Sequence, residues 1–237
     1  MKLGEVVERF SIPPHPQGIS LEGKLVLLKP LKANEFAQQL FAANSSDKAG
    51  INWTYLPYGP FKSADEYKSW VMSFESSSDP IFFAIISKKL NKAIGVASYL
   101  RIKPHKGSIE IGHINYSPLL QNTTSATEAM YLMMKWAFDN GYRGYEWKCN
   151  SLNLKSRKAA QRLGFSYEGV FRQMSINKGR NRDTAWFAII DKEWQGIERC
   201  FIEFLTAENF DDDGKAKVSL SCLTKPLLYK LDNLEGS

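Results

Sequence analysis

Small polar side chains crowd the segment Ser117–Met130, which reads SPLLQNTTSATEAM. It follows an apolar, strand-like run, Ile109–Tyr116, and leads into a helical run, Ala129–Phe138. The side chains could cap the first turn of the helix, since Ser125-Ala-Thr-Glu128 has the S-x-x-E spacing of a capping box. They could equally surround a phosphate, because a helix N-terminus offers unpaired N–H groups and a partial positive charge. The segment alone leaves both interpretations open.

A second set of side chains could exchange protons with a ligand. Glu110 and His113 lie in the strand-like run Ser108–Ser117, and Glu168 lies further along the chain. Side chains two residues apart share one face of a strand, so Glu110 and His113 point to opposite faces unless a β-bulge intervenes. An ordinary charged strand residue and a structural histidine are the competing interpretations of these two positions.

Two further groups of side chains could select a ligand. The first is aromatic and lies in the segment INWTYLPYGPF, where it could line a cleft or seal a core beneath a loop: Trp53, Tyr55, Tyr58 and Phe61. The second is basic and surrounds the turn KGRN, where it could be a solvated hairpin or attract an acidic substrate or phosphates: Arg172, Lys178, Arg180 and Arg182.

Hydrophobic spacing predicts the elements that must position these side chains. The predicted strands are Lys24–Leu31, Ile81–Ser87, Lys92–Ile102, Ser108–Ser117, Arg143–Asn150, Phe165–Asn177 and Arg182–Ile190. The predicted helices are Asn34–Ala43, Ser63–Ser76, Thr127–Asn140, Asn153–Leu163 and one from Asp191 that fades near Asn209. This order predicts a mixed α/β fold around a single sheet, with parallel strands in the unit Ile109–Asn150.

The same pattern predicts three parts of the chain. Residues 1–20, which contain Pro13, Pro14 and Pro16, are expected to form an extended arm. Residues 21–209 are expected to form one domain, and residues 210–237 a poorly patterned tail. No internal repeat is evident.

Composition indicates the cellular compartment, the absence of a metal site and the charge of the partners. No apolar run approaches the roughly 18 residues of a membrane span, and the N-terminus lacks the apolar centre of a signal peptide, so a cytoplasmic protein is expected, with a nuclear one as the alternative. The three cysteines Cys149, Cys200 and Cys222 form no ligand or disulfide pattern, so no metal is expected. The net charge of +6 and the pI of about 9.1 indicate a general preference for anionic partners. No nucleic-acid-binding motif accompanies this charge, and the sequence does not indicate an oligomeric state.

The segment NLKSRKAAQRLGF, Asn153–Phe165, resembles the second signature block of the GNAT N-acetyltransferase superfamily. Segment Ser117–Met130 then falls where that family has its pyrophosphate loop. The sequences ATEA and FSYEGVFR resemble the branch that includes ribosomal-protein N-terminal acetyltransferases, and the resemblance covers roughly residues 21 to 194. It implies a mostly antiparallel sheet with a central parallel strand pair, flanked by helices.

The resemblance also implies an activity: direct transfer of an acetyl group from acetyl-CoA to an amine, either a protein N-terminus or a small molecule. It implies that Ser156 protonates the departing thiolate, and Glu110 is the first candidate for the base, with His113 and Glu168 as alternatives. The implied acetyl-CoA site comprises Ile114, Asn115, Tyr116, Gln121, Asn122, Thr123, Thr124, Ser125, Ala126, Thr127, Asn153 and Ser156. The acceptor is expected to contact Trp53, Tyr55, Tyr58 and His113.

Two positions depart from the family pattern. Thr124 stands where the pyrophosphate loop usually has its central glycine, and Asn122 stands where a second glycine is frequent. Glycine allows a phosphate to approach the backbone closely and permits unusual dihedral angles. A catalytically silent acyl-CoA-binding module is therefore the alternative to an active transferase.

Overall fold

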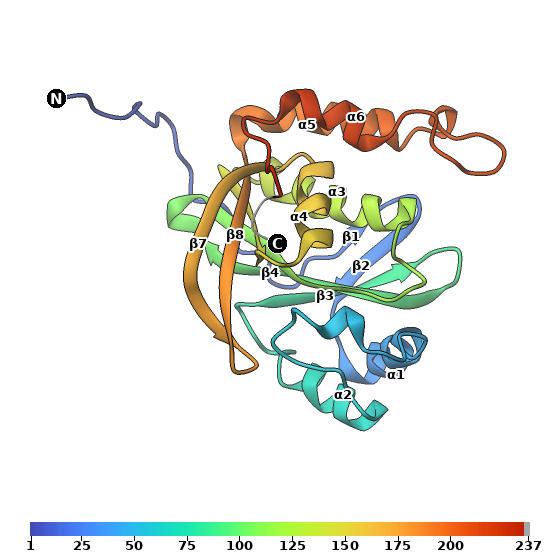
Figure 1. Ribbon diagram of the computed structural model, residues 1–237. Helices are drawn as coiled ribbons and strands as arrows, with labels where there is room; N and C mark the ends of the chain where they lie inside the picture. Colours follow the sequence, from blue (N-terminus) through green and yellow to red (C-terminus); the bar gives the residue numbers. More distant parts are fainter. Residues whose placement is uncertain (235–237) are drawn as a thin grey trace.

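The computed structural model describes residues 1–234, and within these residues the strands form one eight-stranded sheet (Figure 1). Its spatial order is β1-β2-β3-β4-β5-β6-β8-β7, and every neighbouring pair is antiparallel except the parallel pair β5–β6. The strands are β1 Leu21–Glu22, β2 Val26–Pro30, β3 Ile81–Ser87, β4 Lys92–Lys103, β5 Ser108–Tyr116, β6 Gly144–Asn150, β7 Ser166–Asn177 and β8 Arg180–Ile190. The predicted fold class, a mostly antiparallel mixed sheet with one parallel pair, is confirmed.

Helices cover both faces of the sheet (Figure 1). Helices α1 and α2 lie on one face, and α3, α4 and α5 lie on the other, with α6 beside α5. The helices are α1 Ala33–Asn44, α2 Ala64–Met72, α3 Thr124–Asp139, α4 Leu154–Arg162, α5 Asp191–Phe204 and α6 Leu220–Thr224. The predicted helices are all present, with ends shifted by a few residues, and α6 lies in the tail, where the pattern indicated no element.

Strand β3 explains how one sheet supports two hydrophobic cores. Phe83 and Ile85 belong to the core beneath α3 and α5, whereas Phe82 and Ala84 belong to the core beneath α1 and α2. Successive side chains of a strand point to opposite faces, so a strand covered on both faces must be apolar throughout. The run IFFAIIS is therefore continuous rather than alternating.

Helix α3 begins three residues earlier than its spacing predicted, and a different residue caps it. The Thr123 hydroxyl accepts a hydrogen bond from the Ala126 amide at 3.1 Å, and Thr124 is the first helical residue. The capping-box interpretation of Ser125 and Glu128 is therefore wrong.

The carboxylate of Glu128 holds the turn between β1 and β2 instead. It accepts hydrogen bonds from the backbone amides of Lys24, Leu25 and Val26 at 2.7 to 2.9 Å. The approach is so close that a Cβ on Gly23 would lie 2.5 Å from the Glu128 carboxyl carbon. Three amide donors satisfy the buried charge, so Glu128 anchors the first strands of the sheet to the start of α3.

The two ends of the chain both contact the domain. In the N-terminal arm, Pro13 and Pro16 are buried, and the Tyr142 hydroxyl donates to the Pro14 carbonyl at 3.0 Å. Near the C-terminus, the Tyr167 amide of β7 donates to the Lys230 carbonyl at 2.9 Å. The chain after α6 therefore returns alongside the start of β7.

Candidate active site

The parallel strands β5 and β6 pair over only part of their length. Their register runs from Ser108 opposite Gly144 to Ile111 opposite Trp147, and no further pair forms within the described chain. Strand β5 nevertheless continues to Tyr116, and β6 continues to Asn150. The two strands therefore diverge and leave an opening in the middle of the sheet, with unpaired backbone along one edge of β5.

A β-bulge on β5 lies at this opening. Ser98 of β4 pairs with Gly112, but Val96 pairs with Asn115, so β5 contains one extra residue there. His113 has a φ of 50°, in the left-handed region, which fits an extra residue in the bulged strand. In a regular strand Glu110 and His113 would point to opposite faces of the sheet. The bulge interrupts this alternation, so both side chains can lie on one face.

His113 lies against the aromatic loop. Its ring stacks on Tyr58 at a centroid distance of 5.6 Å and an interplanar angle of 14°, and its Nδ1 lies 3.2 Å from the Tyr58 hydroxyl. It also contacts Phe82, which belongs to the core beneath α1 and α2. Burial, and then the positive charges of Arg101 and Arg182, lower the pKa of His113 to about 4. The imidazole is therefore neutral at pH 7.

Glu110 is buried and ion-paired. Its carboxylate accepts from Arg101 at 2.6 Å and from Lys148 at 2.7 Å, and Lys148 also pairs with Glu146. Burial raises the pKa of Glu110 above its usual value, although both cations oppose this shift. A raised pKa suits a carboxylate that accepts a proton near neutral pH, but the two ion pairs restrain the group.

Ser156 lies near the point where the strands diverge. Its hydroxyl oxygen accepts a hydrogen bond at 3.0 Å from the indole of Trp147, the last β6 residue paired with β5. Asn153 caps α4, because its side-chain oxygen accepts from the Ser156 amide at 3.2 Å. Capping thus positions the serine, whose hydroxyl also lies within hydrogen-bond reach of the Cys149 thiol.

The loop before α3 adopts the conformation that its residue types allow. Asn122 has a φ of 57°, a left-handed conformation that asparagine tolerates better than most residues. Thr124 has a helical backbone, which does not require glycine. The amides of Thr124 and Ser125 have no acceptor among residues 1–234, as expected for the first turn of a helix.

Other expected ligands of the cofactor already have partners in the protein. The Gln121 amide donates to the Tyr116 carbonyl and to the Asn52 side chain, each at 2.8 Å. Asn115 differs, because both polar atoms of its buried side chain lack a hydrogen-bond partner among residues 1–234. An orphaned buried amide of this kind is rare in folded proteins.

Sequence reasoning missed Arg162 of α4. Its guanidinium donates to the Thr127 hydroxyl at 3.2 Å, and no carboxylate within the described part of the chain pairs with it. Burial lowers its pKa, yet arginine stays charged in proteins. Arg162 therefore adds positive charge beside the N-terminal half of α3. Its place on the same helix as Ser156 was the signal that could have revealed it.

The aromatic loop packs on the core beneath α1 and α2 and also contacts His113 and Leu152. Trp53 is buried and packs on Phe61 and Tyr67, so its ring seals the core beneath α2. Tyr58 stacks on His113, and the Tyr55 hydroxyl donates to the Leu152 carbonyl at 3.1 Å. The loop therefore seals the core through Trp53, and Tyr58 packs on the same core. A role of Tyr55 and Tyr58 in lining a cleft stays a prediction.

The β7–β8 hairpin closes onto this loop. The Lys178 ammonium donates to the carbonyls of Trp53 and Gly59, each at 2.9 Å, and the Asn177 side chain reaches the Tyr55 carbonyl at 3.4 Å. Gly59 is required here, because it has a φ of 65° and a Cβ would lie 2.5 Å from the Trp53 ring. The hairpin tip and the loop therefore form a bridge beside the opening in the sheet.

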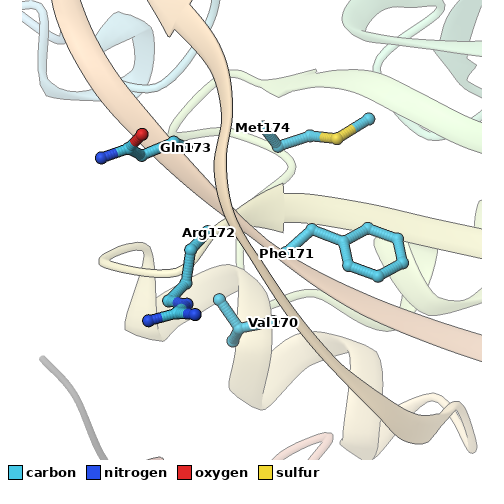
Figure 2. Close-up of a pocket in the computed structure, with 5 residues that line it drawn as sticks. All are labelled: Val170, Phe171, Arg172, Gln173 and Met174. Carbon is cyan, nitrogen blue, oxygen red and sulfur yellow. The ribbon is translucent and has the colours of Figure 1, made fainter.

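A hollow of about 800 Å³ lies along β7, lined by Val170–Met174 (Figure 2). Figure 2 shows Phe171 and Met174 projecting to the same side of the strand. Phe171 contacts Trp186 of β8 at a centroid distance of 4.6 Å, and Thr184 lies opposite Phe171. The hollow is thus separated from the opening by β8, which pairs with both β6 and β7.

Two further observations concern ligands and membranes. No group of three His, Cys, Asp or Glu side chains in residues 1–234 has a metal-binding arrangement. No helix in the same part of the chain combines the length and the apolar character of a membrane span.

The parallel strands β5 and β6 diverge, and the helix α3 between them begins with unpaired backbone amides. Comparison with known proteins assigns this arrangement to a family. The model of the acetyltransferase (GNAT) domain matches residues 26–166, so the chain belongs to the GNAT family of acetyltransferases. It is an acyltransferase that uses acetyl-CoA.

The solved structures of two bacterial relatives support this assignment. A GCN5-related N-acetyltransferase from Brucella melitensis is 41% identical, with a TM-score of 0.90 over 92% of this chain and 100% of that one. A GNAT-family acetyltransferase from Chromobacterium violaceum is 36% identical, with a TM-score of 0.77 over 82% and 98% of the two chains. N-acetyltransferase p20 of Bacillus licheniformis is 26% identical over 151 residues, which are 60% of this chain and 82% of p20.

Proposed function

We propose that the protein transfers the acetyl group of acetyl-CoA to an amine at the opening between β5 and β6. One observation carries the proposal: the Ser156 hydroxyl is hydrogen-bonded to Trp147, where the paired part of the two strands ends. If the thioester lies in the opening, this hydroxyl would be the proton donor for the departing thiolate.

The protein's unpaired polar groups fit the cofactor. The Ser117 amide donates to the Ile94 carbonyl of β4, so by alternation the amides of Tyr116 and Ile114 face the open edge. These two amides would bind the pantetheine arm, and they could stabilise an oxyanion. The first amides of α3, together with Arg162, would hold the pyrophosphate. The side chains of Asn115 and Asn153 remain candidates for further contacts.

Three groups of the protein could handle the protons. Acetyl-CoA supplies a thioester carbonyl as the electrophile. Ser156 would give its proton to the departing sulfur, and Glu110 would accept a proton from the ammonium of the acceptor, directly or through water. His113, neutral and beside Tyr58, is the alternative acceptor of that proton. Correct positioning of the amine supplies much of the rate in either case.

The acceptor would approach from the side of the aromatic loop, past Tyr55, Tyr58 and His113. Two structures with the same fold at 20 to 21% identity illustrate the range of this family. One is the microcin C7 self-immunity acetyltransferase MccE in complex with acetyl-CoA and AMP. The other is RimL, the ribosomal L7/L12 alpha-N-protein acetyltransferase, which has also been solved with coenzyme A. A small amine and a protein N-terminus are both compatible acceptors.

Calorimetry with acetyl-CoA and a thiol-release assay over amines and short peptides would test the proposal. We expect saturable acetyl-CoA binding and turnover of at least one amine or peptide. Tight binding without turnover of any acceptor would favour the silent acyl-CoA-binding module instead. Absence of acetyl-CoA binding would contradict both interpretations.

A further inference from the structure

Arg182 of β8 has an unusual environment for an arginine. Its Nε is buried without a hydrogen-bond partner, and no carboxylate among residues 1–234 lies within ion-pair distance of its guanidinium. Burial lowers the pKa of Arg182, and the positive charge of Arg101 adds to this shift, whereas the more distant negative charge of Glu110 opposes it. A buried donor left without an acceptor costs about 1–3 kcal/mol, so a protein rarely keeps one unless a ligand supplies the acceptor.

The strand register places Arg182 on the same face of the sheet as the ion-paired cluster of Glu110. Trp186 pairs with Lys148, and Glu110 lies opposite Glu146 in the parallel pair. Side chains of paired residues share a face, and alternate residues of β8 return to it. Arg182, four residues before Trp186, therefore belongs to the face that carries Lys148 and Glu110.

Arg182 also lies between the opening in the sheet and the hollow on β7. In the β7–β8 pair, Arg182 lies opposite Ser175 of β7. Ser175 directly follows Val170–Met174, the segment that lines the hollow (Figure 2). Thr184 is the next residue of β8 on the same face as Arg182. It pairs with Asn150, the last residue of β6, which borders the opening. A ligand that extends from the opening toward the hollow would therefore pass Arg182.

The charges on this face do not balance. Arg101 and Lys148 both pair with Glu110, and Lys148 also pairs with Glu146. His113 is neutral at pH 7 because of its lowered pKa. Lys178, at the tip of the hairpin, is bound to two carbonyl groups. Arg180 shares the parity of Arg182 on β8 but is exposed to solvent. Arg182 is thus the partly buried cation of this face that forms no ion pair with a carboxylate of the described chain.

We propose that Arg182 binds a carboxylate or phosphate group of the acceptor, so that the acceptor is an amine that also carries an anion. A guanidinium forms bidentate hydrogen bonds with either oxyanion, which would orient the acceptor as well as bind it. The amine of the same molecule would then point toward the opening between β5 and β6. This inference rests on the proposed acetyl transfer and adds the chemical class of its acceptor.

The test compares matched acceptors that differ only in the anion. The probes are amino acids and tripeptides with a free carboxylate, the same compounds as amides, and their aminophosphonate analogues. With the full chain and saturating acetyl-CoA, we expect kcat/KM for the carboxylate or phosphonate to exceed that of the amide by about 10- to 100-fold, the range for a hydrogen bond to a charged group. A preference for carboxylate over phosphonate, or the reverse, identifies the anion.

The variant Arg182→Gln should remove this preference and leave both the acetyl-CoA affinity and the turnover of the amides unchanged. The variant Arg182→Lys keeps the charge but not the bidentate geometry, and should restore the preference in part. Arg180→Gln, which removes an exposed charge from the same hairpin, is the matched control and should keep the preference.

Three outcomes would overturn the inference: equal use of acids and amides by the wild-type protein, equal loss for both in Arg182→Gln, or loss of acetyl-CoA binding in that variant. Calorimetric titration of the CoA-loaded protein with the same probes gives a readout independent of turnover. Equal affinity for acid and amide there would overturn the inference as well. By contrast, acid-selective binding without any acetyl transfer would support the Arg182 site and count against the proposed function.

Discussion

Arg157 of α4 and Asp232 near the C-terminus form a bidentate ion pair in which both side chains are almost completely buried, at 1% and 2% exposure. The two hydrogen bonds measure 2.8 and 2.7 Å. The same guanidinium donates to the Ser151 carbonyl at 2.8 Å, in the turn that leads to the capping residue Asn153. The C-terminal segment therefore supports the helix that carries Ser156.

Replacing Asp232 should destabilise the fold strongly. In Asp232→Asn the buried guanidinium loses its anionic partner, and breaking such a pair costs about 3–5 kcal/mol. Urea unfolding would measure the change in the free energy of unfolding. Asp212→Asn, at an exposed position, is the control and should change it by less than about 0.5 kcal/mol. A loss below about 1 kcal/mol in Asp232→Asn would show that the tail contributes little.

Removing the hydroxyl of Ser156 should slow turnover without weakening cofactor binding. A general acid contributes about 100-fold or more to the rate, so Ser156→Ala should lower kcat by about that factor with an unchanged Kd for acetyl-CoA. Steady-state kinetics and calorimetry separate the two effects. Ser156→Thr retains a hydroxyl and should keep more activity than Ser156→Ala. Normal turnover in the alanine variant would remove Ser156 as the acid.

A negative charge at Thr124 should prevent acetyl-CoA binding. Glutamate in the first turn of a helix is favourable for the fold, whereas a carboxylate beside a pyrophosphate costs several kcal/mol. We expect Thr124→Glu to raise the Kd for acetyl-CoA by about 100-fold or more at an unchanged melting temperature. The variant Thr124→Gly restores the residue usual in the family and should still bind. Unchanged affinity in Thr124→Glu would place the pyrophosphate elsewhere.

Glu110 should control the acid side of the pH–rate profile. A base must be ionised to accept a proton, so activity should fall as the pH drops through the raised pKa of Glu110. Glu110→Gln should lower kcat/KM and remove that limb. Glu146→Gln is the matched control, because Glu146 also pairs with Lys148. It should keep the limb but move it to lower pH, since the charge of Glu146 helps to raise the pKa of Glu110. A limb that persists in Glu110→Gln would indicate another base.

His113 should make the fold less stable at acidic pH. Its pKa falls from 6.5 to about 4 on folding, so between these values the unfolded chain binds more protons and stability decreases as the pH is lowered. At pH 5.5 this effect amounts to about 1 kcal/mol relative to neutral pH. Unfolding of the wild-type protein and of His113→Gln at pH 7.5 and 5.5 would measure it. An identical pH dependence in both would contradict the buried, neutral imidazole.

Much of the fold could be predicted from local pattern. The order of strands and helices follows from hydrophobic spacing, because apolar residues recur with a period of two in strands and about 3.6 in helices. The parallel pair β5–β6 follows from the helix between them. The activity could be predicted as well, because Asn153 and Ser156 lie within one short segment, Asn153–Phe165, that resembles a family block.

The contacts that define the candidate site were decided by tertiary structure. The bulge at His113 depends on how β5 pairs with β4, and Glu128 binds amides more than 100 residues earlier in the chain. Arg157 forms a buried ion pair with Asp232, whereas Arg182 forms no ion pair with a carboxylate of the described chain. A local pattern shows which side chains carry charge, but which charges meet depends on long-range packing. The sequence therefore determined the elements and the chemical class, and the folded chain decided which polar groups remain available for a ligand.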